Sequence, residues 1–83
     1  MDARRKKLQF RAWRRGFREI DLILGKFADR NLAGLDTPAL DAFEALLDAP
    51  DQEVYAWIVG QAPAPAAHDT PVLAAIRAEA LAQ

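Results

Sequence analysis

The stretch RRGFREID, residues 14–21, contains the first glycine of the chain and separates two helical patterns. Before and through it, Phe10, Trp13 and Phe17 recur at the spacing of one helix face. Gly16 fits the position just after a helix, where a positive φ costs little only for glycine. The stretch therefore predicts a corner between two helices.

The rest of the chain continues in helical patterns, and no alternating strand pattern occurs. Thr37 and Thr70 each precede a proline, which is typical of a helix cap followed by its first residue. Gly60 fits a helix end, and a proline–alanine loop is expected over residues 61–69, with His68 exposed to solvent. We predict an all-α fold, one domain over residues 1–83, as a small bundle of about five helices near residues 3–15, 17–32, 38–48, 50–59 and 70–81.

Aromatic side chains at helical spacing predict core positions. Tyr55 is the exception, because it lies outside the apolar stripe of its helix. Gly25, inside the second predicted helix, should cost about 1 kcal/mol relative to alanine. The aromatic residues expected in the core are Phe10, Trp13, Phe27, Phe43 and Trp57.

The composition limits the chemistry open to the chain. Its 83 residues include no cysteine, no serine and a single histidine, His68. Neither a Ser–His or Cys–His pair nor a zinc site of several histidines can therefore form. We predict no catalytic residues and no metal ligands, and a protein that is not an enzyme.

Charge is divided unevenly along the chain. Residues 1–18 hold eight Lys or Arg and one Asp, whereas residues 19–83 hold three basic and eleven acidic side chains. The basic helix could meet an acidic protein groove, an acidic membrane surface or nucleic acid, or could be a solvated face that balances the acidic remainder. The charge pattern alone leaves these alternatives open.

The beginning of the chain bears on location. MDARRKKLQFRAWRR, residues 1–15, is Arg-rich like a mitochondrial presequence. It also contains Asp2, lacks serine and holds apolar residues that the domain needs, which favours a structural helix. No apolar run approaches the length of a membrane span, so no membrane insertion is expected. We predict a cytoplasmic, bacterial location.

Capping explains part of the charge at the corner. Arg15 suits the carboxyl end of the first helix, and Glu19 suits the amino end of the second. Capping does not require Arg14, Arg15 and Arg18 together. The corner could therefore also make a functional contact, in addition to its capping role.

Beyond the corner, the sequence RRGFREIDLILGKFA, residues 14–28, resembles the Arg-Gly-x-x-Glu signature and apolar helix of the succinate dehydrogenase assembly factor family. Bacterial members of this family are called SdhE, and the mitochondrial counterparts are called assembly factor 2. FEALLDAPDQEVYAWIVGQAPAP, residues 43–65, is similar to its Leu-Leu, Pro-Asp and Trp segment, and VLAAIR, residues 72–77, resembles its closing helix. Two departures are Phe17, where methionine is common, and Trp13, where members vary.

The resemblance implies a protein that binds the flavoprotein subunit of succinate dehydrogenase or, in some bacteria, of fumarate reductase. It implies that the protein promotes covalent attachment of FAD to a histidine of that subunit. FAD then belongs to the partner, so we expect this chain to bind no cofactor stably and to be a monomer when free. The residues predicted to contact the flavoprotein are Arg15, Gly16 and Glu19 of the signature and their charged neighbours Arg11, Arg14, Arg18 and Asp21.

Two other functions stay open at this point. A small nucleic-acid-binding or antitoxin-like regulator would use the basic amino-terminal helix, although no helix-turn-helix spacing is evident and nucleic acid is not the expected partner. A structural adaptor would stabilise a partner without affecting its flavin chemistry.

Overall fold

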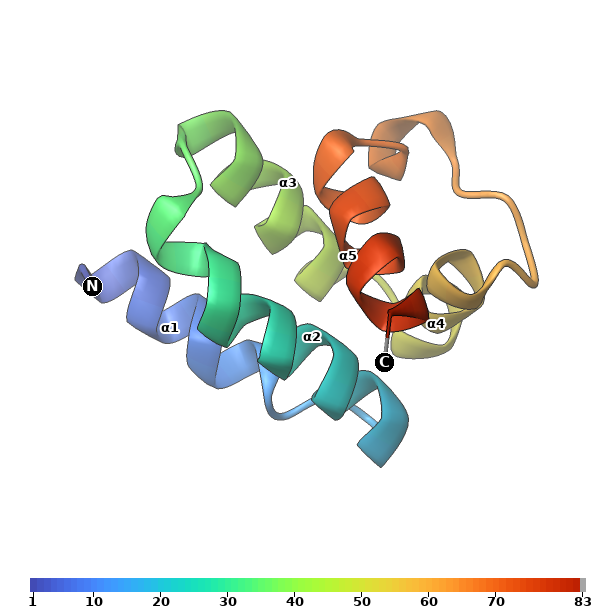
Figure 1. Ribbon diagram of the computed structural model, residues 1–83, viewed down its shortest axis with the longest axis horizontal. Helices are drawn as coiled ribbons and strands as arrows, with labels where there is room; N and C mark the ends of the chain where they lie inside the picture. Colours follow the sequence, from blue (N-terminus) through green and yellow to red (C-terminus); the bar gives the residue numbers. More distant parts are fainter. Residues whose placement is uncertain (83) are drawn as a thin grey trace.

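The computed structural model describes residues 1–82, and within them the chain forms five α-helices and two short 3-10 helices (Figure 1). No strand occurs in this range, which confirms the predicted all-α fold of about five helices in a single domain. The elements are α1 (Ala3–Ala12), α2 (Arg18–Asn31), η1 (Leu32–Gly34), α3 (Thr37–Asp48), α4 (Asp51–Val59), η2 (Ala66–His68) and α5 (Pro71–Leu81).

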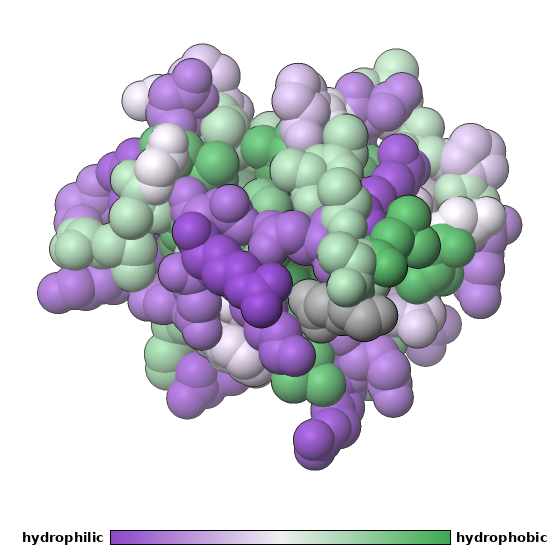
Figure 2. All heavy atoms as spheres, in the orientation of Figure 1, coloured by the Kyte–Doolittle hydropathy of each residue, from purple (hydrophilic) through white to green (hydrophobic). Residues whose placement is uncertain are grey.

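The five α-helices pack around one core. Helices α1 and α2 lie side by side and run in opposite directions, while α5 contacts α2, α3 and α4 (Figure 1). Buried apolar side chains from all five α-helices make up the core, and no polar or charged residue among residues 1–82 is buried. On the face shown in Figure 2, hydrophilic side chains cover much of the surface. None of the helices in the described part of the chain is long and apolar enough to cross a bilayer.

Two helix starts show how local chemistry sets the boundaries. The side chain of Asp36 accepts the backbone N–H of Ala39 at 3.0 Å, so Thr37 is the first residue of α3 and not its cap. The predicted cap is wrong by one residue, because a carboxylate is the stronger acceptor for an amide at a helix start. Thr70 does cap α5 as predicted, and its hydroxyl accepts the N–H of Leu73 at 3.3 Å.

The loop at residues 61–69 folds back over the core. Gly60 ends α4 with a φ of 82°, as predicted. Helix η2 then places His68 against Trp57, with ring centroids 5.1 Å apart and ring planes 24° from parallel. His68 is therefore partly buried, and the prediction of a solvent-exposed histidine is wrong, because the ring of Trp57 offers apolar surface that stacking removes from water.

The inner face of α1 differs from the prediction. Leu8 and Ala12, one helical turn apart, are buried at 2% and 0% exposure, whereas Phe10 is 58% exposed. Phe10 lies two residues from Leu8, which places it on the opposite side of the helix. Its predicted core position is therefore wrong. The aromatic residues that are buried as predicted are Phe27, Phe43 and Trp57.

Trp13 is half-buried, because it lies over the backbone of α2 at Gly25. A Cβ atom added to Gly25 would lie 2.2 Å from the indole ring. The indole Nε1 also donates to Asp29 Oδ1 at 3.1 Å. The glycine that looked like a weak point in the helix thus makes room for the Trp13 ring, which follows α1 and packs on α2.

Candidate functional site

The connection between α1 and α2 is a corner of five residues, 13–17. Helix α1 ends at Ala12, three residues before the predicted boundary, and α2 begins at Arg18. Gly16 does not have the positive φ predicted for it, since Gly60 alone has one among residues 1–82. The prediction of a left-handed cap at Gly16 is therefore wrong, and the need for glycine must come from its surroundings.

Asp51, the first residue of α4, holds the corner from across the bundle. Its Oδ1 accepts from Arg15 Nε at 2.9 Å and lies 2.8 Å from Arg15 Nη2 as an ion pair, and its Oδ2 accepts from the Gly16 N–H at 2.6 Å. Arg15 Nη2 also donates to the Leu47 carbonyl at 2.6 Å. The Arg15 and Asp51 side chains are only 11% and 22% exposed, so these charge-assisted bonds are screened less than surface pairs.

This arrangement explains the glycine. A Cβ atom at position 16 would lie 2.8 Å from Asp51 Oδ2, closer than any ordinary contact. The carboxylate would have to shift to make room, which would weaken its bond to the Gly16 N–H. Glycine is therefore needed for close approach and not for an unusual φ.

Asp21 closes the corner from the side of α2. Its Oδ1 accepts the backbone N–H of Arg15 at 2.5 Å. Because the N–H groups of Arg15 and Gly16 both bond to side chains, the chain leaves α1 before residue 15. Asp21 and Arg15 thus shape the corner from within, and their contact with a partner stays a prediction.

The basic residues of the amino-terminal region divide into two groups of four. The first group, which forms ion pairs within the chain at 2.8 Å or less, is Arg4, Arg5, Arg11 and Arg15. The second group is exposed and forms no ion pair with any of residues 1–82: Lys6, Lys7, Arg14 and Arg18. The positive charge left for a partner is therefore on the outer face of α1 and at the corner, where Arg14 lies 3.7 Å from the ring centroid of Phe10.

The amino end of α1 carries two shifted pKa values. The backbone N–H of Arg5 lowers the pKa of the Asp2 carboxyl, whose side chain accepts it. Hydrogen bonds to Asp41 and Glu44 raise the pKa of Arg4. Both shifts favour the charged forms: the Asp2 carboxylate caps the start of α1, and the Arg4 guanidinium links α1 to α3.

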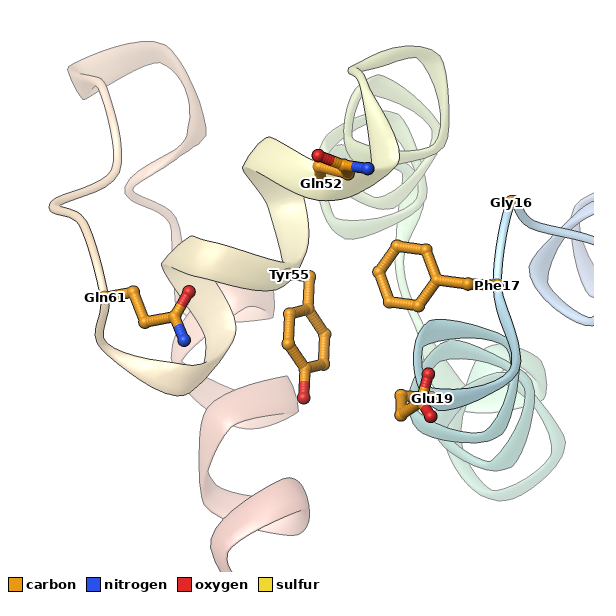
Figure 3. Close-up of a pocket in the computed structure, with 6 residues that line it drawn as sticks. All are labelled: Gly16, Phe17, Glu19, Gln52, Tyr55 and Gln61. Atoms are coloured by element: carbon orange, nitrogen blue, oxygen red, sulfur yellow. The ribbon is translucent and has the colours of Figure 1, made fainter.

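An open hollow of about 450 Å³ lies beside the corner, between the start of α2 and helix α4 (Figure 3). Phe17 and Tyr55 meet edge to face across it, with ring centroids 5.3 Å apart and planes at 80°. The Tyr55 side chain stands between Gln61 on one side and Phe17 and Glu19 on the other (Figure 3). The residues that line the hollow are Gly16, Phe17, Glu19, Gln52, Tyr55 and Gln61.

Of the predicted site residues, Gly16 and Glu19 both line the hollow. Arg14 and Arg18 are exposed and lie close to these two residues in the sequence. Arg11 points instead to Asp48, with 2.6 Å between Nη2 and Oδ1. Sequence reasoning missed the roles of Asp51 and Tyr55, although one belongs to the Pro-Asp pair and the other is the aromatic residue off its helix stripe. No cluster of three or more metal-binding side chains occurs in the part of the chain that the structure describes. The arrangement is suited to binding a surface.

Removing the carboxylate of Asp51 should destabilise the protein measurably. Asp51→Ala leaves the Arg15 guanidinium and the Gly16 N–H without their main acceptor, and should lower the free energy of unfolding by about 2 kcal/mol. Asp48→Ala is the matched control, because its pair with Arg11 is exposed and should cost less than about 1 kcal/mol. Urea unfolding followed by tryptophan fluorescence compares the two, and equal losses would contradict this role of Asp51.

Comparison with known proteins points to one family. A family model described as flavinator of succinate dehydrogenase matches residues 6–80. The FAD assembly factor SdhE of Acetobacter pasteurianus is 38% identical over 71 residues, which cover 86% of this chain and 65% of that protein. Mitochondrial succinate dehydrogenase assembly factor 2 is 40% identical over 57 residues in Debaryomyces hansenii and 39% identical over 69 residues in Dictyostelium discoideum.

The two mitochondrial matches cover 69% and 83% of this chain, and the chain spans 40 to 65% of the length of these three relatives. The family match includes the corner, the hollow and all or most of every α-helix. It confirms the resemblance that starts at RRGFREID. The chain belongs to the family of flavinators of succinate dehydrogenase.

Proposed function

We propose that this protein binds the flavoprotein subunit of succinate dehydrogenase, or of fumarate reductase, and promotes covalent attachment of FAD to a histidine of that subunit. Membership of the flavinator family supports the flavin-assembly role. The observation that carries the proposal is the corner, which Asp51 and Asp21 hold in one shape while Arg14 and Arg18 stay exposed. A surface prepared in this way loses little conformational entropy on binding.

The proposed mechanism is docking and not catalysis by this chain. The chain contains no cysteine or serine to act as a nucleophile, and FAD would belong to the flavoprotein. Docking would hold the flavoprotein in the conformation that places its histidine against the flavin, and such positioning lowers the barrier to a bond between two groups. The chain would act as a monomer in the bacterial cytoplasm and would hold no cofactor of its own.

We assign the corner residues two kinds of role in this docking. The outward residues Gly16, Glu19 and the exposed arginines would contact the flavoprotein through close approach and charge-assisted bonds. Arg15 and Asp21 would act mainly by holding the corner in its docking shape, because their polar groups are already bonded within the chain. Arg11 would support the same shape through Asp48.

The function is tested in a bacterial strain that lacks its own assembly factor. With this protein present, covalent flavin on the flavoprotein should be restored, as read by in-gel fluorescence, at unchanged flavoprotein abundance. Restored abundance with no covalent flavin would favour a structural adaptor and overturn the proposal. A gel shift with duplex DNA at low salt tests the nucleic-acid alternative, and a shift would support it. Four of the eight basic residues near the amino terminus already form ion pairs within the chain, which reduces the charge available to DNA.

Charge at the corner should matter more than charge along α1. Arg14→Gln with Arg18→Gln should weaken flavoprotein binding by about tenfold at low salt, and by less at high salt, since exposed charges are screened. Lys6→Gln with Lys7→Gln removes the same charge from the far part of α1 and is the matched control. Calorimetric titration with the purified flavoprotein at two salt concentrations measures both, and equal effects of the two double variants would contradict docking at the corner.

A further inference from the structure

The hollow beside the corner is rich in polar groups without partners. Hydrogen bonds to other residues of the described chain are absent for the side chains of all four of its polar residues. These residues come from three places, the start of α2, helix α4 and the turn after Gly60 (Figure 3). They are Glu19, Gln52, Tyr55 and Gln61.

The walls of the hollow are held in place by bonds outside it. Phe17, which precedes α2 with an extended backbone, supports the Tyr55 ring edge to face. Gly60 turns the chain so that the Gln61 N–H donates to the Ala56 carbonyl at 2.8 Å. Asp51 fixes the neighbouring Gly16. The hollow is therefore formed before any partner arrives, which lowers the entropic cost of filling it.

The chemistry of the hollow suits a planar cation. Glu19 offers a carboxylate with no ion pair among residues 1–82, and the two glutamine amides and the Tyr55 hydroxyl offer further acceptors. Tyr55 also offers an aromatic ring. A guanidinium presents five donors in one plane and stacks on aromatic rings, whereas an ammonium is a strongly hydrated point charge. The volume of about 450 Å³ leaves room for one long side chain.

We infer that this hollow receives an arginine side chain of the flavoprotein, whose guanidinium pairs with Glu19 and lies against Tyr55. The inference rests on the proposed function for the identity of the partner. It also gives the docking surface two signs, positive at Arg14 and Arg18 and negative at Glu19. Such a pattern fixes the orientation of the partner, because the reversed orientation would bring like charges together.

Binding of the purified flavoprotein tests the contact. Glu19→Gln and Tyr55→Leu should each weaken binding by about 10- to 100-fold, the loss expected for a charge-assisted contact. Tyr55→Phe keeps the ring and should lose less. Glu53→Gln is the matched control, because Glu53 is an exposed acid of α4, the helix of Tyr55, and lies outside the hollow. The Glu53→Gln protein should bind like the unaltered protein. If Glu19→Gln and Tyr55→Leu both bind the flavoprotein as tightly as the unaltered protein does, the hollow does not receive an arginine of the flavoprotein. The proposed function would not be affected by that result.

A second measurement reads the hollow without the flavoprotein. N-acetylarginine amide, titrated at millimolar concentration, should shift the NMR signals of Glu19 and Tyr55, and the shift of Tyr55 should disappear in Glu19→Gln. N-acetyllysine amide should produce smaller shifts. Equal shifts with both amides, or none with the arginine amide, would overturn the assignment. Arginine-specific shifts together with no binding of the flavoprotein would support the hollow and count against the proposed function.

Discussion

Gly16→Leu is expected to abolish covalent attachment of FAD to the flavoprotein while the five helices still form. The added Cβ would lie 2.8 Å from Asp51 Oδ2, so the carboxylate must shift, which weakens its bonds to the Gly16 N–H and to Arg15. The rest of the leucine side chain would then stand where the partner must approach. Loss of the corner bonds should cost about 1 to 3 kcal/mol, which is less than the stability of most folded domains. Covalent flavin, measured by in-gel fluorescence, should fall below detection.

Gly34→Leu is the matched control for this change. A Cβ atom on Gly34 would meet no heavy atom within 4 Å, so the same substitution should leave both helicity and flavin attachment unchanged. The failure of Gly16→Leu could come from the clash with Asp51 or from the lost support of the corner. Gly16→Ala combined with Asp51→Ala has no clash but also lacks the support, so a failure of this double variant would point to the support. A Gly16→Leu protein with normal circular dichroism and normal covalent flavin would show that the corner is not the docking surface.

Gly25→Ala should destabilise the protein by about 2 to 4 kcal/mol, the cost of forcing atoms into a packed contact. The new Cβ would lie 2.2 to 2.6 Å from three atoms of the Trp13 ring. Either the indole leaves its place and loses its bond to Asp29, or α1 and α2 move apart. Helix propensity alone predicts the opposite sign, a gain of about 1 kcal/mol for alanine in place of glycine.

The sign of this change is therefore the test. Thermal and urea unfolding, followed by the helical signal, give the free energy of unfolding for Gly25→Ala and for Gly34→Ala, whose site is open. Gly34→Ala should be close to neutral. Trp13→Ala is itself destabilising, but adding Gly25→Ala to it should cost little more, because the clash is gone. A stabilised Gly25→Ala single variant would show that the indole does not pack on α2 as described.

These two glycines show where sequence reasoning reached its end. From the sequence alone, we predicted a left-handed φ at Gly16 and a helix-propensity cost at Gly25, because both predictions use only the local backbone. In the structure both glycines are sites of close approach, to Asp51 and to Trp13. The contacts join residues far apart along the chain, so no local pattern contains them.

The charged residues show the same limit. Counting charges predicted a basic amino-terminal helix, but the count could not tell paired arginines from free ones. Arg15 and Asp51 are 36 residues apart, and Arg4 and Asp41 are 37 apart. Phe10 was misplaced for a related reason, since the periodicity of α1 fits two faces and only packing on the rest of the bundle selects the one with Leu8.

The sequence by itself determined the all-α fold, the number and order of the helices, the cap at Thr70, the turn at Gly60 and the resemblance to the flavinator family. Helix periodicity and caps act over three or four residues, so the sequence contains them in full. Only the tertiary structure decided that Asp51 holds the corner and that Tyr55 forms a hollow with Glu19. These arrangements exist only after burial of the core brings α4 against the corner, because the residues that form them are otherwise separated by more than thirty positions of flexible chain.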